Sequence, residues 1–388
     1  MLFKSRDRKP AAAFSISNNR FAACVLALGM VFSVLAGWSS PTHGTFLFLG
    51  GAWLVIALLL ALRRMASRTR LIAVRVPPGV VVSVTTLCLS LALFELGLRL
   101  FSFQRFPSFQ GLDQQTLGYQ HDRSLGWFPT PNSKKSVEII GRRISIAHNS
   151  KGFRDPEPVV DSRPGIIFLG DSFVWGYNVE AEERFTERLR FRHPEWRIYN
   201  FGVAGYGTDQ EYLLLQAHFQ EYQPHIVFLI FCTENDHIDN CANGGGRIAF
   251  KPYFTPGPHG LQLHGVPVPY SDRVFCLKHP LLAKSYLARL TMQAWGNFRC
   301  PLPPRPEQDP TTALLEAMRQ FVVSRGAVFC VGLNGRDAGI ERFLRDSNIP
   351  YVDLSTDLRA EGDFHWSVQG HAFVADKIEK FLLCSKMF

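Results

Sequence analysis

The chain has 388 residues, enough for two domains, with a formal net charge of +9 and 46% hydrophobic residues. Much of the positive charge lies in short basic stretches beside apolar segments near the N-terminus, and no stretch interleaves basic with aromatic residues. This distribution argues against nucleic-acid binding, so we expect no nucleic-acid partner.

Three apolar segments, residues 21–38, 44–62 and 79–98, are each long enough to cross the hydrocarbon layer as a helix. Their single charge is Glu95, which can pair with Arg99 at the outer end of the third segment. A cleaved signal peptide is the alternative for the first segment, but no small-x-small cleavage site precedes the second. Basic residues precede the first segment and separate the second from the third, while residues 39–43 contain no Lys or Arg. The sequence therefore predicts a cytoplasmic tail over residues 1–20, a three-helix membrane anchor over residues 21–100 and an extracytoplasmic remainder.

Eight cysteines are present, without the CxxC or Cys-His spacing of a zinc site. Two lie in the apolar segments, and the others would face an oxidising compartment that permits disulfides. Cys276 and Cys300 are the candidate pair. Cys330 lies in an apolar run and is expected to be a packed thiol.

Residues 101–162 are predicted to be an extracytoplasmic lead-in that contains a small β-hairpin over residues 137–146 and packs against the following domain. From residue 163 to 388, apolar runs alternate with helical patterns. The expected strands are residues 165–170, 197–201, 225–231, 327–333 and 351–354, and the expected helices are residues 182–192, 209–222, 311–324, 339–346 and 368–383. Thr208 and Glu211 predict a capping box at the start of the second helix. This alternation predicts an α/β fold with a parallel sheet covered on both faces, interrupted by an insertion over residues 240–308.

Four polar stretches lie just past the ends of expected strands. They are residues 170–173 (Gly-Asp-Ser-Phe), 200–205 (Asn-Phe-Gly-Val-Ala-Gly), 233–236 (Thr-Glu-Asn-Asp) and 363–366 (Asp-Phe-His-Trp). Taken alone, Gly170, Asp171 and Ser172 favour a turn or a helix cap over a functional site. Because the carboxyl ends of parallel strands meet at one edge of a sheet, one crevice can gather all four stretches. Their convergence favours a functional site.

The residue types in these stretches suit acyl transfer, which needs a nucleophile, a base, a group that orients the base, and donors for the oxyanion. Ser172 supplies the hydroxyl, and His365 is the expected base. Asp363 lies two residues before His365, so in an extended segment both side chains project to the same side. The expected oxyanion donors are the backbone N–H groups of Ser172 and Gly205 and the side-chain amide of Asn235.

Other residues offer alternatives. His237 and His371 are rival bases, although His237 is expected to point away from the crevice and His371 to lie on a helix surface or in packing. Asp236, His237 and Asp239 are possible metal ligands, but such residues in a loop more often cap or face solvent. We expect no metal and no cofactor. Asp171 is expected to be structural, and Trp175 and Tyr177 are left outside the site because packing is commoner for them than stacking on a sugar.

The four stretches resemble the four blocks of the SGNH or GDSL hydrolases over about residues 165–383. The resemblance implies a flavodoxin-like three-layer α/β/α sandwich, with Ser172, His365 and Asp363 as the catalytic triad and Ser172, Gly205 and Asn235 as the oxyanion hole. Thr233 stands where the third block usually has glycine, and Asp363 precedes His365 by two residues where many members have three. The Asp-x-His-Trp form looks like bacterial cell-surface polysaccharide O-acetyltransferases, and residues 149–154 and 205–210 look like membrane-anchored SGNH proteins found near envelope polysaccharide genes.

The expected protein is therefore a bacterial inner-membrane protein whose periplasmic domain is a serine esterase, removing O-acyl and in particular acetyl groups from an envelope carbohydrate. An O-acyltransferase uses the same residues, but it needs a partner membrane protein as acyl donor. A non-catalytic carbohydrate-binding or assembly component is the third alternative, because fold does not fix function.

Overall fold

The computed structural model describes residues 78–101, 118–243, 250–258, 260–269, 279, 281–299, 308–385 and 387. The expected cytoplasmic tail, the first two expected membrane segments and the candidate disulfide between Cys276 and Cys300 lie outside these residues. The chain divides into two units, Met1–Phe109 with His279–Thr291, and Gln110–Lys278 with Met292–Phe388.

The smaller unit contains α3 (Pro78–Phe101), in which Val82–Leu100 is long and apolar enough to cross a membrane. The predicted ion pair is confirmed, with Glu95 and Arg99 2.8 Å apart. Glu95 also accepts hydrogen bonds from the backbone N–H groups of Tyr286 (2.9 Å) and Leu287 (2.8 Å), at the start of α10 (Tyr286–Arg299), which follows the short helix η2 (Leu282–Lys284). The carboxylate therefore satisfies N–H groups that have no partner inside their own helix.

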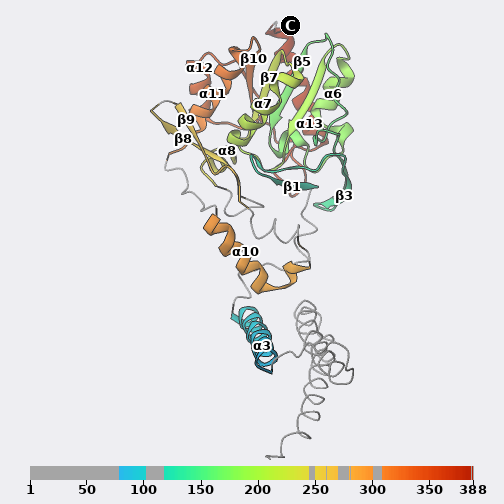
Figure 1. The fold of residues 1–388 in the computed structure, drawn as a ribbon. Helices are drawn as coiled ribbons and strands as arrows, with labels where there is room; N and C mark the ends of the chain where they lie inside the picture. The colour runs from blue at the N-terminus through green and yellow to red at the C-terminus, as the bar shows by residue number, and fades with distance from the viewer. Residues whose placement is uncertain are drawn as a thin grey trace, which may run out of the picture. The chain divides into compact units, whose positions relative to one another are not determined.

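The larger unit is built on five parallel strands. They are β5 (Gly165–Gly170), β6 (Arg197–Gly202), β7 (Ile226–Phe231), β10 (Val328–Leu333) and β11 (Tyr351–Asp353). Their order across the sheet is β11-β10-β7-β5-β6, and every neighbouring pair is parallel (Figure 1). Numbered along the chain, this is the flavodoxin-like order, in which the second strand lies beyond the first. The expected parallel α/β sheet is confirmed.

Two hydrophobic cores lie on opposite faces of this sheet. Ile166 and Phe168 pack with the core that includes α6 (Phe185–Arg192) and α13 (Val368–Cys384). Ile167 and Leu169 pack with the core that includes α7 (Thr208–Tyr222), α11 (Thr311–Val323) and α12 (Ala338–Asp346). Because successive side chains of a strand point to opposite faces, one apolar run contributes to both cores. The result is a three-layer α/β/α arrangement.

The predicted capping box at α7 is wrong. The helix begins at Thr208 and its N-cap is Gly207, without a side-chain cap. The Gly207 carbonyl accepts the N–H groups of Gln210 (3.0 Å) and Glu211 (3.2 Å). Thr208 therefore lies one position inside the helix, where its hydroxyl is not placed to cap the first turn.

The lead-in contributes two antiparallel pairs, β1 (Tyr119–Asp122) with β2 (Gly126–Pro129), and β3 (Lys134–Ile139) with β4 (Arg142–Ala147). The second pair is the predicted hairpin. Trp127 and Phe153 belong to the core on the α7 side, where the Phe153 ring stacks on Phe201 at 4.1 Å between centroids. The lead-in thus shares its core with the domain that follows.

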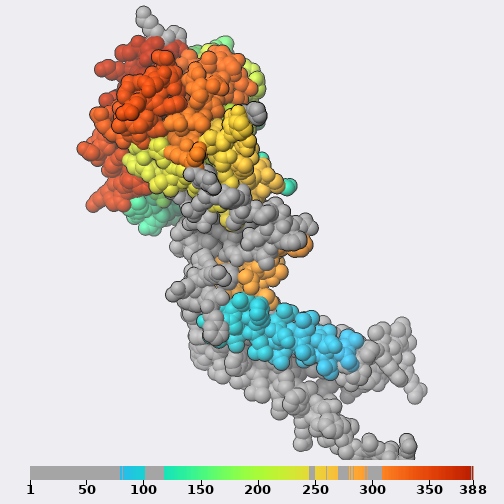
Figure 2. All heavy atoms as spheres, turned by 90° about the vertical axis from the view of Figure 1, so that its left-hand side faces the viewer, coloured from blue at the N-terminus to red at the C-terminus, as the bar shows by residue number. Residues whose placement is uncertain are grey.

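In the described part of the insertion, β8 (Tyr253–Gly257) and β9 (Gly260–His264) form a hairpin. The hairpin lies against α7 and α11, with Phe254 5.9 Å from Tyr212 between ring centroids. Figure 2 shows the hairpin in yellow beside orange atoms of the chain. Cys330 is a buried free thiol, as expected.

Candidate active site

Ser172 stands where β5 passes into the short helix α5 (Ser172–Trp175). Asp171 caps this helix, because its Oδ1 accepts the backbone N–H of Phe173 at 2.9 Å. Burial raises the pKa of Asp171. Gly170 is required at the turn, since a Cβ there would lie 2.4 Å from Val174 Cγ2. The serine is held at the carboxyl end of a central strand with 8% of its surface exposed.

Ser172, His365 and Asp363 form a chain of hydrogen bonds. The distance from Ser172 Oγ to His365 Nε2 is 2.7 Å, and the distance from His365 Nδ1 to Asp363 Oδ1 is 2.8 Å. An ionised carboxylate only accepts hydrogen bonds, so the Nδ1 proton donates to Asp363 and Nε2 is left to accept from the serine. The structure thus places the three predicted residues in the geometry of a nucleophile, a base and an orienting acid.

Asp363 is ionised in this arrangement. Burial alone raises its pKa, but the hydrogen bonds and charge of His365 outweigh burial and bring the pKa below its ordinary value. The carboxylate is therefore available to stabilise the imidazolium that forms when His365 takes a proton.

The expected oxyanion donors lie on loops that touch the nucleophile loop. Asn235 precedes α8 (Asp236–Asn240), and its Nδ2 donates to Asp171 Oδ2 at 3.3 Å, which leaves its second amide hydrogen free for another acceptor. Gly205 has φ +83°, a conformation that favours glycine. Among the residues that the structure describes, the backbone N–H groups of Ser172 and Gly205 have no hydrogen-bond partner. Three donors remain available beside the serine.

The end of β6 is joined to α5 by Asn200, a residue for which the sequence predicted no role. Its Nδ2 donates to the Val174 carbonyl at 2.7 Å and to Thr186 Oγ1 at 3.1 Å, while its Oδ1 accepts the N–H of Gly202 at 3.0 Å. A Cβ at Gly202 would lie 2.1 Å from the Trp175 backbone nitrogen. The end of β6 and the nucleophile helix therefore pack backbone to backbone.

The rival bases are engaged elsewhere. His237 lies between two carboxylates, with Nδ1 2.6 Å from Asp309 Oδ2 and Nε2 3.0 Å from Asp337 Oδ2. His371 is buried, and burial together with nearby positive charges lowers its pKa to about 3. Of the possible metal ligands, Asp236 accepts the N–H of Cys232 at 2.8 Å. Neither rival histidine contacts Ser172 in the described part of the chain.

Aromatic rings surround the base. The centroid of the His365 ring lies 4.1 Å from that of Phe364 and 4.5 Å from that of Tyr177. Phe364 is 48% exposed, whereas Trp175 is fully buried with the Arg154 guanidinium 4.6 Å from its ring centroid. Phe364 was not singled out from the sequence, although its place directly before His365 was a signal for it.

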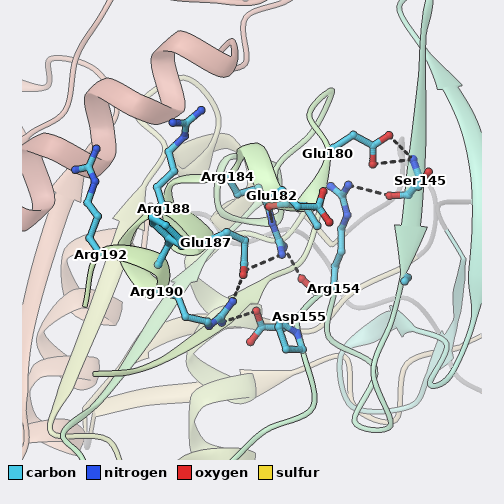
Figure 3. Close-up of a pocket in the computed structure, with 14 residues that line it drawn as sticks. Ser145, Arg154, Asp155, Glu180, Glu182, Arg184, Glu187, Arg188, Arg190 and Arg192 are labelled. Carbon is cyan, nitrogen blue, oxygen red and sulfur yellow. Dashed lines mark hydrogen bonds and ion pairs between the residues drawn. The ribbon is translucent and has the colours of Figure 1, made fainter. Parts of the chain in front are cut away.

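A cavity of about 820 Å³ lies against α6 and the short helix η1 (Ala181–Glu183) (Figure 3). Some of its charged side chains pair with one another, as Arg190 does with Asp155 at 2.8 Å. Arg154 instead donates to the Gly176 carbonyl at 2.7 Å, at the end of the nucleophile helix. The triad residues do not line this cavity, and Arg154 is the lining residue that contacts the end of α5.

No family model and no curated protein sequence matches the chain. Among solved structures, it is similar to the esterase EstA from Pseudoalteromonas sp., with 12% identity and a TM-score of 0.33 over 57% of this chain and 97% of that one. A member of the lipolytic protein G-D-S-L family from Veillonella parvula has 14% identity and a TM-score of 0.32 over 56% of this chain and 96% of that one. A two-domain esterase active on acetylated mannans has 15% identity and a TM-score of 0.34 over 58% of this chain and 50% of that one.

The chain is similar to GDSL-type hydrolases. Two of these structures are esterases, and the third is a member of the lipolytic protein G-D-S-L family. In this chain, Ser172, His365 and Asp363 have the geometry from which a function can be inferred.

Proposed function

We propose that this chain is an SGNH-type serine esterase that removes O-acyl groups, chiefly acetyl, from an envelope carbohydrate outside the cytoplasm. The observation that carries the proposal is the pair of hydrogen bonds, 2.7 Å and 2.8 Å long, that join Ser172 to His365 and His365 to Asp363. The nucleophile is thus hydrogen-bonded to its base, and the base is hydrogen-bonded to the carboxylate that orients it, as acyl transfer requires.

In the first half of the reaction, Ser172 Oγ attacks the ester carbonyl carbon while His365 Nε2 takes the hydroxyl proton. The negative charge on the carbonyl oxygen is stabilised by the N–H groups of Ser172 and Gly205 and by the Asn235 amide. Asp363 stabilises the imidazolium. His365 then gives its proton to the departing sugar oxygen, which leaves an acyl-serine and a free sugar hydroxyl.

In the second half, His365 takes a proton from water as the water oxygen attacks the acyl carbon. The second tetrahedral intermediate collapses when the bond to Ser172 Oγ breaks and His365 returns the proton to the serine. The products are the free carboxylic acid and the original enzyme. A sugar hydroxyl in place of water would make the same residues an O-acyltransferase.

Two features support a carbohydrate ester as substrate. The half-exposed Phe364 ring beside the base offers an aromatic face against which the apolar face of a sugar ring can pack. The low exposure of Ser172, at 8%, suits a small acyl group such as acetyl.

The apolar Val82–Leu100 segment supports attachment to a membrane.

The proposal is tested with the full chain in detergent, by following acetate release from p-nitrophenyl acetate and from acetylated xylan. Ser172→Ala should lower kcat by at least about 10³-fold. Ser347→Ala is the control, because Ser347 follows α12 and its hydroxyl makes no hydrogen bond in the described structure.

Addition of an unacetylated sugar acceptor separates hydrolysis from transfer. Acetate release that is unchanged by the acceptor supports the esterase, whereas an acetylated acceptor would show a transferase. Equal activity of Ser172→Ala and wild type, or no turnover and no covalent labelling of Ser172 by a phosphonate, would contradict the proposal and favour a binding component.

A further inference from the structure

We propose that Trp127, in the lead-in, is a positioning residue that sets the direction of the Gly205 N–H in the oxyanion hole. The inference rests on the proposed function, since it concerns a donor of that same site. Trp127 lies outside the four blocks, and no role at the site follows for it from the sequence.

The decisive contact is a buried hydrogen bond from Trp127 Nε1 to the Ala204 carbonyl oxygen, 3.2 Å long. This carbonyl and the Gly205 N–H belong to one peptide unit. In a trans peptide the C=O and the N–H point in opposite directions, so fixing the carbonyl fixes the N–H. The indole therefore directs the Gly205 N–H away from Trp127, and that N–H has no partner among the described residues.

Two further contacts hold the same loop. The Val203 N–H donates to the Gly170 carbonyl at 3.1 Å, which joins the loop to the nucleophile strand. The Ala204 N–H donates to the Tyr119 hydroxyl at 3.0 Å. Lead-in side chains thus make two of the hydrogen bonds that fix the peptides before Gly205. A flexible glycine at φ +83° needs such restraints to present one N–H direction.

Trp127 is itself held rigidly. Its side chain is 3% exposed, and its ring packs edge-on against Tyr206 with 5.5 Å between centroids. The Tyr206 hydroxyl donates to the Trp127 carbonyl at 2.5 Å. The preceding residue must be glycine, because a Cβ at Gly126 would lie 2.3 Å from the Phe250 carbonyl oxygen. A donor fixed in this way can impose its direction on the loop.

Trp127→Phe tests the inference because it removes the N–H and keeps an aromatic ring. Trp196→Phe is the matched control, since Trp196 precedes β6 at the opposite end of that strand. A misdirected oxyanion donor weakens only the transition state, so we expect kcat for p-nitrophenyl acetate to fall about ten- to a hundredfold with KM unchanged.

A thionoester of the same alcohol serves as a second substrate. A general loss of packing would slow both substrates equally, and so it would leave the ratio of the two rates unchanged. Sulfur is a weak hydrogen-bond acceptor, so its reaction draws less on the oxyanion hole. In Trp127→Phe the preference for the ester over the thionoester should therefore shrink, while Trp196→Phe should keep the wild-type preference. Tyr119→Phe, which removes the acceptor of the Ala204 N–H, should shift the preference in the same direction, and it decides the matter if Trp127→Phe does not fold.

The inference is overturned if both substrates slow equally in Trp127→Phe and Tyr119→Phe, or if the loss appears in KM. It is also overturned if Trp127→Phe behaves as Trp196→Phe does. The same assays include wild type and Ser172→Ala. Serine-dependent turnover with an unaltered preference refutes the role of Trp127 alone, whereas the absence of serine-dependent turnover refutes the proposed function and this inference with it.

Discussion

The change of Asp363 to Asn tests whether this carboxylate orients the base. Its Oδ1 accepts from His365 Nδ1 at 2.8 Å and from the His365 backbone N–H at 3.4 Å. Its Oδ2 is buried and has no hydrogen-bond partner among the described residues. The side-chain amide of an asparagine can take two orientations at this position, and each orientation is unfavourable for catalysis.

If the asparagine keeps its carbonyl oxygen toward His365 Nδ1, its NH₂ group takes the place of Oδ2. No hydrogen-bond acceptor among the described residues contacts Oδ2 there. A buried donor without a partner costs about 1–3 kcal/mol, and the imidazolium also loses its negative neighbour. If the amide turns over, the NH₂ group faces the backbone N–H of His365 and favours the imidazole tautomer with its proton on Nε2. That tautomer is unable to take the proton of Ser172.

We therefore expect Asp363→Asn to lower kcat by about 10³- to 10⁴-fold, which corresponds to about 4–5 kcal/mol of transition-state stabilisation, with KM unchanged. The measurement is steady-state hydrolysis of p-nitrophenyl acetate by the full chain. Asp357→Asn is the control because it removes an exposed carboxylate six residues away. A variant that keeps more than a tenth of wild-type kcat would refute the role of Asp363.

Two further predictions concern folding. Phe153→Ala should lower the free energy of unfolding by about 3–5 kcal/mol in urea denaturation, because Phe153 is 1% exposed. The control is Phe191→Ala, at an 89% exposed position, which should change the free energy of unfolding by no more than about 0.5 kcal/mol. Equal effects of the two changes would contradict the core that the lead-in shares with the domain. Burial, assisted by the charge of Arg184, lowers the pKa of His371 from 6.5 to about 3. Below pH 6.5 the unfolded chain therefore binds a proton that the folded chain does not bind. The free energy of unfolding falls for this reason as the pH falls toward 3. His371→Asn should remove about 2 kcal/mol of the loss between pH 6.5 and 4.5, and an unchanged slope of unfolding free energy against pH would refute this.

The central sheet could be predicted from the sequence because its strands are nearly continuous apolar runs. Residues 165–170 are buried on both faces, so the run shows no alternation, and its Gly residues mark its limits. Once strands and helices alternate, right-handed crossovers leave few possible topologies. The positions of Ser172 and Asn235 then follow from the ends of β5 and β7. The position of His365 does not, because it lies twelve positions after the end of β11.

Sequence patterns gave wrong or missing predictions where contacts between distant parts of the chain determine the structure. Thr208 and Glu211 have the spacing of a capping box, yet the helix takes Gly207 as its N-cap. Likewise, the sequence near Trp127 gives no sign of a contact with Ala204, because 77 positions separate the two residues and no periodicity links them. Phe364 differs, since its place before His365 followed from the same motif that revealed the base.

These contacts bear on where the catalytic part of the chain begins. A chain that starts at residue 163 keeps all four blocks, and therefore every atom of the proposed chemistry. It lacks the Trp127 and Tyr119 side chains that hold the Ala204 peptides, and the Phe153 ring that covers Phe201. The Ala204 carbonyl would lose the indole donor, and the Gly205 N–H would lose its fixed direction. The four blocks are thus sufficient to specify which groups react, while the lead-in is needed to hold one of them in place.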